Sequence, residues 1–103
     1  MTKQELAVKM QGNQAWVPGK TVKLDFGDQG AIMLDGNAQQ VTDLGPGDPG
    51  AADTTIKVNW GDWQKMADGE LDGMTAFMTG KLKIEGDMSN AMQLQGVLAK
   101  LRG

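Results

Sequence analysis

The sequence is most informative in the residue types that it lacks. Its 103 residues include no cysteine, no histidine and no tyrosine, and Ser89 is the only serine. Without cysteine there is no disulfide and no thiolate metal site, and without histidine a zinc site also lacks its usual nitrogen ligands. A hydrolytic triad would lack its usual base, so catalysis would have to rest on a tuned Asp, Glu or Lys. We therefore expect no metal site and no cofactor, whereas catalysis is not excluded although most of its usual routes are closed.

Positive charge and long hydrophobic runs are also scarce. The formal net charge is −3, which disfavours nucleic acid as a partner and strong electrostatic docking on anionic membranes. The longest apolar run, residues 31–34, is far too short to span a bilayer, and residues 1–5 lack the apolar core of a signal peptide. We expect a cytoplasmic protein without stable membrane insertion. The sequence leaves open whether the chain forms a homodimer.

The length and the hydrophobic periodicity predict one α+β domain, residues 1–103. Thr2 and Glu5 have the spacing of a capping box, which predicts a short first helix that ends near Gly12. Alternating apolar and polar residues predict strands at residues 21–26, 31–35, 38–42, 54–60 and 81–85. Further helices are predicted at residues 62–68, between Asp72 and Gly80, and from Asp87 to about Leu101.

The expected architecture is a five-stranded, mostly antiparallel sheet that helices cover on one face. Strands that alternate inward apolar and outward polar residues are typical of a sheet with one solvated face. On the strands, the candidate lining residues of the inner layer are Phe26, Ile32, Ile56, Val58, Leu82 and Ile84. On the predicted short helices and their flanks, the candidates are Trp60, Met66, Met74, Phe77 and Met78. On the last helix, they are Met88, Met92, Gln95 and Leu98.

Residues 53–98 carry a resemblance to a known family. The quoted landmarks are Gly69-Glu70-Leu71, Ala76-Phe77-Met78, Gly80-Lys81-Leu82-Lys83-Ile84 and Gly86-Asp87-Met88, followed by Ala91-Met92 and Leu94-Gln95. With this spacing and without a gap, the segment resembles the C-terminal half of the sterol carrier protein type-two family. Residues 21–35 fit the first two strands of that family more weakly.

The resemblance implies an apolar tunnel between the sheet and its helices, with no catalytic residues. Members of the family bind fatty acids, fatty acyl-CoA, phospholipids or sterols. Two features depart from the family pattern: the first helix is short, which can leave the cavity open, and Gly73 stands where proline is frequent, so that helix start is less rigid.

Eight methionines suit a cavity for variable acyl chains, because the thioether side chain is flexible and polarizable. The alternative is that each methionine simply fills a gap in the core. Gln95 would meet the polar end of a lipid, or else hydrogen-bond to backbone carbonyls or water. Trp60 and Trp63 are interpreted as core and rim anchors rather than ligand contacts. Lys81 and Lys83 are solvated cations that could also attract a phosphate or lipid headgroup.

The leading hypothesis is non-catalytic binding and transfer of an apolar lipid in an internal hydrophobic cavity. The alternative is an interaction or regulatory module with the same fold and a filled core. An enzyme is the third reading, and it would need a carboxylate or a lysine with a strongly shifted pKa inside a cleft.

Overall fold

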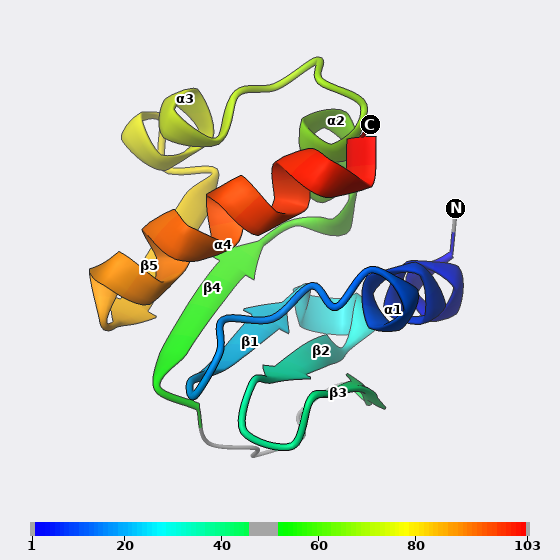
Figure 1. Cartoon of the computed structure of the whole chain (residues 1–103). Coiled ribbons are helices and arrows are strands. Elements are labelled where there is room, and N and C mark those ends of the chain that lie inside the picture. Colours follow the sequence, from blue (N-terminus) through cyan, green and yellow to red (C-terminus); the bar gives the residue numbers. More distant parts are fainter. Residues whose placement is uncertain (1, 46–51, 103) are drawn as a thin grey trace.

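The computed structural model describes residues 2–45 and 52–102, which form one α+β unit (Figure 1). The N-terminal half contains α1 (Lys3–Gly12), β1 (Thr21–Asp25), the 3-10 helix η1 (Gly27–Gln29), β2 (Ala31–Asp35) and β3 (Gln40–Leu44). The C-terminal half contains β4 (Thr54–Val58), α2 (Trp60–Ala67), α3 (Gly73–Met78), β5 (Leu82–Gly86) and α4 (Met88–Arg102).

The five strands form one mixed sheet in the order β3-β2-β1-β4-β5. The pairs β1–β2, β2–β3 and β4–β5 are antiparallel, whereas β1 and β4 run parallel. Leu24 lies at the centre, with Ile32 opposite it on β2 and Ile56 opposite it on β4. The predicted five-stranded, mostly antiparallel sheet is therefore confirmed, and the parallel pair in its middle joins the two halves of the chain.

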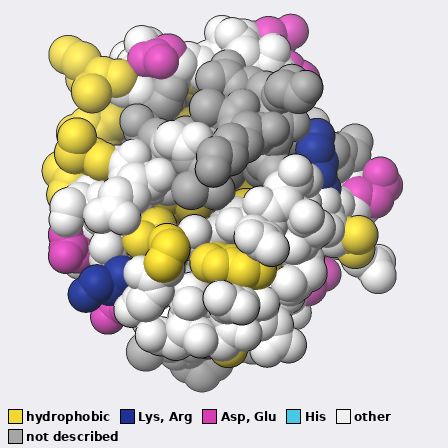
Figure 2. Space-filling view, viewed as in Figure 1, with side chains coloured by type: hydrophobic (Ala, Val, Ile, Leu, Met, Phe, Trp, Pro, Cys, Tyr) yellow, Lys and Arg dark blue, Asp and Glu magenta, His cyan; other side chains and the backbone are white. Residues whose placement is uncertain are grey.

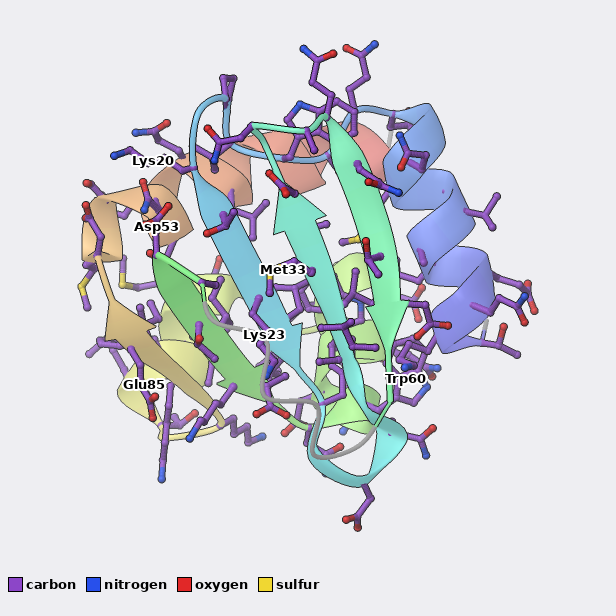
Figure 3. The ribbon with its side chains drawn as sticks, turned by 90° about the horizontal axis from the view of Figure 1, so that it is seen from below. Lys20, Lys23, Met33, Asp53, Trp60 and Glu85 are labelled. Atoms are coloured by element: carbon purple, nitrogen blue, oxygen red, sulfur yellow. The ribbon has the colours of Figure 1, made fainter. Side chains whose placement is uncertain are left out.

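Three helices lie on one face of the sheet. Figure 1 shows α2, α3 and α4 gathered on that face, while α1 lies along the edge formed by β3. Figure 3 shows the opposite face, where no helix of the described segments covers the strands. Lys23, Met33 and Glu85 project from this open face (Figure 3), in agreement with the predicted solvated side.

The core lies between the sheet and the helices and is continuous. Val22, Leu24 and Ile56 point inward from the strands, because alternate side chains of a strand share one face. The helices contribute buried side chains that pack against the strands: Leu6 and Met10 from α1, Trp63 from α2, Ala76 from α3, and Ala91 and Leu94 from α4.

Short polar side chains fix where the helices begin. Thr2 Oγ1 accepts the N–H of Glu5 at 3.1 Å, as the capping box predicts. Asp72 Oδ2 accepts the N–H of Thr75 at 3.2 Å, and Asp87 Oδ1 accepts the N–H of Ser89 at 2.9 Å. These three caps confirm the predicted starts of α1, α3 and α4.

Three predicted strand boundaries were wrong by two residues. The fourth strand ends at Val58 rather than at residue 60, because Asn59 caps α2 through the N–H of Gly61 at 2.7 Å. The third strand runs from Gln40 to Leu44 rather than over residues 38–42. Asp35 Oδ1 accepts the N–H groups of Asn37 and Ala38, and this turn delays the strand.

Candidate functional site

A groove that opens to solvent lies at the end of the sheet where β1 and β4 stop. Its volume is about 710 Å³, within the range of small-molecule sites in proteins. Its apolar wall consists of Phe26, Val58 and Trp60, which come from the ends of β1 and β4 and the start of α2. The lining also contains five charged residues: Asp25, Asp28, Lys57, Lys81 and Lys83. The groove thus combines an aromatic surface with a charged rim.

A tight turn after β1 places Phe26 at the groove. Asp25 Oδ1 accepts the N–H of Gly27 at 2.9 Å, and the N–H of Phe26 donates to the carbonyl oxygen of Gly30 at 2.9 Å. Gly27 has φ +68°, a left-handed conformation that a residue without Cβ adopts at little cost. The chain therefore reverses directly after Phe26 and leaves its ring at the boundary between groove and core.

Phe26 connects two indole rings. Its ring centroid lies 5.0 Å from that of Trp60, with the planes at 81°, and 5.7 Å from that of Trp63, with the planes at 61°. Both contacts are edge-to-face, an arrangement that aromatic pairs prefer over face-to-face stacking. Trp60 is partly exposed, whereas Phe26 and Trp63 each have only 4% of their surface exposed. The aromatic side chains therefore lead from the groove into the core.

The indole N–H of Trp63 is buried, and its Nε1 has no hydrogen-bond partner among the described residues. A buried donor that forms no hydrogen bond loses the free energy of its hydration, roughly 1–3 kcal/mol. Such a group is a candidate contact for an acceptor atom that a bound ligand brings with it.

Lys57 stands in the middle of a row of charges on the solvated face. It pairs in register with Asp25 on β1 and with Lys83 on β5. Its Nζ forms an ion pair with Glu85 Oε1 at 2.9 Å, and the hydrogen bond and negative charge of Glu85 raise the pKa of Lys57 above its usual 10.5. The ammonium group of Lys57 is therefore already paired with a carboxylate of the protein.

Lys81 and Lys83 differ from Lys57, because neither has an ion pair or a side-chain hydrogen bond within the described part of the chain. Both side chains are exposed. The groove rim therefore presents two exposed ammonium groups that form no ion pair with any described residue.

The structure places the predicted strand residues on the inner side of the sheet. Phe26, Ile32, Ile56, Val58 and Leu82 are buried, and Ile84 packs partly buried against the same core. Trp60 and Met66 on α2 are also partly buried against it. Of these residues, Phe26, Val58 and Trp60 line the groove. The others are core residues, and a role for them in lipid binding stays a prediction.

Five predicted lining residues are not in the inner layer. The exposed fractions are 58% for Met74, 40% for Phe77, 78% for Met78, 46% for Met88 and 67% for Met92. The predicted inward orientation was therefore wrong for these side chains.

The physical reason is that α3 and α4 each bury only a few of their described side chains against the sheet. Of the described side chains of α3, Ala76 alone is buried, and α4 turns Asn90, Ala91 and Leu94 toward the sheet. The side chains of Gln95 and Leu98 lie outside what the structure describes, so their predicted roles stay predictions.

Sequence patterns did not indicate that the charged residues Asp25, Asp28 and Lys57 line a groove. Strand alternation assigned Asp25 and Lys57 to the solvated face, which is correct, but it did not indicate that they lie side by side. Only the parallel pairing of β1 with β4 brings them together.

No helix in the described ranges is long and apolar enough to cross a membrane, and the same residues contain no acidic cluster suited to a metal ion.

The comparison with protein families gives a match over nearly the whole chain. Residues 3–99 match the SCP-2 sterol transfer family. Among curated relatives, stomatin-like protein 1 of Mus musculus is 34% identical over 82 residues, and hydroxysteroid dehydrogenase-like protein 2 of Xenopus tropicalis is 41% identical over 59 residues. These alignments cover 79% and 56% of this chain. They cover 20% and 14% of the relatives, so the chain spans at most a fifth of their length.

Solved structures show the same fold. The solution structure of palmitated SCP2L2 from Aedes aegypti matches with a TM-score of 0.72 at 18% identity, over 95% of each chain. The sterol carrier protein domain 2 of Helicoverpa armigera matches with a TM-score of 0.67 at 24% identity, over 97% of this chain and 84% of that one. The family match over residues 3–99 shows that this chain belongs to the SCP-2 sterol transfer family.

Proposed function

We propose that this chain is a non-catalytic domain that binds and transfers an apolar lipid through the groove at the end of β1 and β4. The observation that carries the proposal is the aromatic and aliphatic wall of Phe26, Val58 and Trp60 in a groove of about 710 Å³. Each methylene that leaves water against such a wall contributes roughly 0.8 kcal/mol. The relative from Aedes aegypti is palmitated, which supports an acyl chain as the ligand class.

The route into the protein follows the aromatic side chains. An apolar body that lies on Trp60 meets the ring of Phe26, and Trp63 stands directly behind that ring. A shift of Phe26 would let the ligand enter the layer between the sheet and its helices. There the ligand would contact the buried strand residues, such as Ile56 and Leu82.

Two groups would orient the ligand. At the rim, the ammonium groups of Lys81 and Lys83 attract a carboxylate or phosphate headgroup. Inside, the unpaired indole N–H of Trp63 donates to a carbonyl or hydroxyl oxygen. Among the described residues, the buried polar side chains are the neutral Thr54 and Asn90, so this interior offers no charged partner to an anion and favours an uncharged acceptor.

The binding test is a titration of delipidated protein with a fluorescent fatty acid. We expect saturable 1:1 binding at micromolar concentration, with a change in tryptophan emission because Trp60 lines the groove. Trp60→Ala should weaken binding by at least about tenfold, which corresponds to the loss of part of one aromatic contact surface. Val8→Ser is the control, since Val8 is exposed on α1, which packs beside β3 at the edge of the sheet opposite β5.

Absence of saturable binding by the unaltered protein would contradict the proposal. It would favour the alternative reading, an interaction module whose interior is filled. Acyl-CoA hydrolysis in the same samples tests the non-catalytic part of the proposal, and we expect no turnover above the rate in buffer.

A further inference from the structure

The two edges of the sheet differ in how their backbone groups are engaged. At β3, side chains of α1 seal the edge: Gln11 Oε1 accepts the N–H of Val41 at 2.7 Å, and Lys3 Nζ donates to the carbonyl oxygen of Leu44 at 2.6 Å. β5 forms the other edge and is the outer strand at the left of Figure 3. No described strand pairs with its outer side. A strand edge of this kind is a template for pairing with another strand.

The register of β5 with β4 determines which backbone groups of β5 face outward. The N–H of Asp87 donates to the carbonyl oxygen of Asp53 at 3.3 Å, and this pair continues the antiparallel register of the two strands. In such a ladder, successive residues direct their N–H and C=O groups alternately toward the partner strand and away from it. Those of Leu82, Ile84 and Gly86 therefore point away from β4. Within the described ranges they have no hydrogen-bond partner.

The charged side chains along this edge follow a self-complementary order. Alternate residues are Lys81, Lys83, Glu85 and Asp87, so two cations precede two carboxylates. When two copies of β5 run antiparallel about a two-fold axis at Ile84, Lys83 of each copy lies opposite Glu85 of the other. One step further from the axis, Lys81 lies opposite Asp87. The same register sets the outward N–H and C=O groups of Ile84 against their counterparts, as reciprocal hydrogen bonding requires.

The cross-strand neighbour of Lys83 within the chain carries the same charge. Lys57 lies opposite it in the register of β4 and β5, and Lys83 forms no ion pair among the described residues. Like charges directly opposite each other destabilise a strand pair. Glu85 of a second copy would place a negative charge on the other side of Lys83. The same carboxylate pairs with Lys57 of its own chain, and its two oxygens can accept both ammonium groups.

Apolar side chains flank this edge on its helical side. Figure 2 shows hydrophobic side chains at the surface over α3 and the start of α4, along the left border of that view. Met78 ends α3 with 78% of its surface exposed, and Met88 begins α4 with 46% exposed. Antiparallel pairing sets the start of one β5 against the end of the other, so Met78 of one copy approaches Met88 of the second. The partly buried Ile84 meets its counterpart at the axis.

We propose that β5 pairs with β5 of a second copy of this chain, so that two five-stranded sheets become one continuous sheet. Backbone hydrogen bonds join the strands, and the alternating charges select the antiparallel register centred on Ile84. Because Lys81 and Lys83 also line the groove, the carboxylates of the second copy lie beside the groove rim. The proposal goes beyond the proposed function and does not depend on it.

The test is sedimentation velocity of the delipidated chain from micromolar to millimolar concentration. We expect a monomer–dimer equilibrium for the unaltered protein, since a single strand edge with a few flanking side chains forms a small interface. Lys83→Glu and Glu85→Lys each set like charges against each other at both symmetry-related positions. Each should weaken dimerisation by roughly tenfold or more. Circular dichroism checks the fold of each variant, and both altered side chains are exposed.

Combining the two changes tests the register itself. Lys83→Glu/Glu85→Lys in one chain restores opposite charges across the axis and should dimerise as the unaltered protein does. An equimolar mixture of the two single variants should form a mixed dimer, because each introduced charge then faces its opposite. Lys9→Glu is the matched control, since it changes the net charge as Lys83→Glu does and lies exposed on α1, beside β3. It should dimerise as the unaltered protein does.

The proposal is overturned if the unaltered chain stays monomeric over the whole concentration range. It is also overturned if Lys83→Glu dimerises normally or if Lys83→Glu/Glu85→Lys fails to dimerise, because the copies then meet through another surface or register. An equal loss of dimer in Lys9→Glu and Lys83→Glu would show a general effect of charge and overturn it as well. Fatty-acid binding is measured separately, so failure of this proposal is distinguishable from failure of the proposed function.

Discussion

The ring of Phe26 meets the indole ring of Trp60 edge-on, with the ring centroids 5.0 Å apart and the planes at 81°. Phe26 is buried and Trp60 is partly exposed, so this contact marks the boundary between the core and the groove. One side chain therefore serves both stability and the shape of the proposed site.

Phe26→Ala is expected to lower the free energy of unfolding by roughly 3–5 kcal/mol, because it leaves a cavity beside both indoles. Phe26→Leu keeps most of the volume and should cost much less. Urea unfolding followed by circular dichroism measures both values. Equal costs for the two variants would contradict a packing role for the ring.

A buried polar pair fastens α4 to the sheet. Asn90 Nδ2 donates to Thr54 Oγ1 at 3.1 Å, and that hydroxyl donates to the carbonyl oxygen of Asp87 at 2.6 Å. We expect Asn90→Ala and Thr54→Val each to cost about 1–3 kcal/mol. The double variant should cost less than the sum, because either change alone removes the same hydrogen bond. Strictly additive costs would show that the two side chains do not act together.

Trp63→Phe tests the unpaired indole N–H, with Trp60→Phe as a matched change of an indole that lines the groove. We expect the Trp63 variant to weaken binding of a fatty acid methyl ester by roughly twofold to tenfold, the worth of one hydrogen bond. Binding of an alkane of equal length should change little. Isothermal titration measures both ligands, and an equal loss for ester and alkane would contradict a hydrogen bond from Trp63.

The start of α4 predicts a dependence of stability on pH. Hydrogen bonds from the side chain and backbone of Ser89 lower the pKa of Asp87 below its usual 3.8. The carboxylate therefore stabilises the fold above pH 3.8, and that contribution is lost as the pH falls through the lowered pKa. In Ser89→Ala we expect the pKa of Asp87 to rise toward 3.8, which carboxyl NMR titration measures. An unchanged pKa in this variant would show that the Ser89 hydroxyl has no role.

Local signals predicted the element starts well. Thr2, Asp72 and Asp87 were recognised as caps because a cap needs only a few neighbouring residues. The inward side of each strand was also predictable, because alternation along a strand is a local property. For the same reason Ile32 and Ile56 are buried as expected.

The site was less predictable because it depends on non-local pairing. Lys57 and Asp25 are far apart in the sequence and meet only through the parallel pair of β1 and β4. The rotation of α4 about its axis could not be predicted from the sequence. Its apolar residues cover so much of the helix circumference that several rotations would bury a similar number of apolar side chains. The structure buries Ala91 and Leu94 and exposes Met88 and Met92.

The most direct measurement uses the three indole N–H signals of the protein in a ¹H–¹⁵N NMR titration with a fatty acid. Trp60 lines the groove and Trp63 lies behind Phe26, whereas Trp16 precedes β1 on the chain and is absent from the groove lining. Lipid binding at this groove predicts saturable shifts of the Trp60 and Trp63 signals with little change at Trp16. If all three signals stay in place as fatty acid is added up to its solubility, the protein does not bind lipid there.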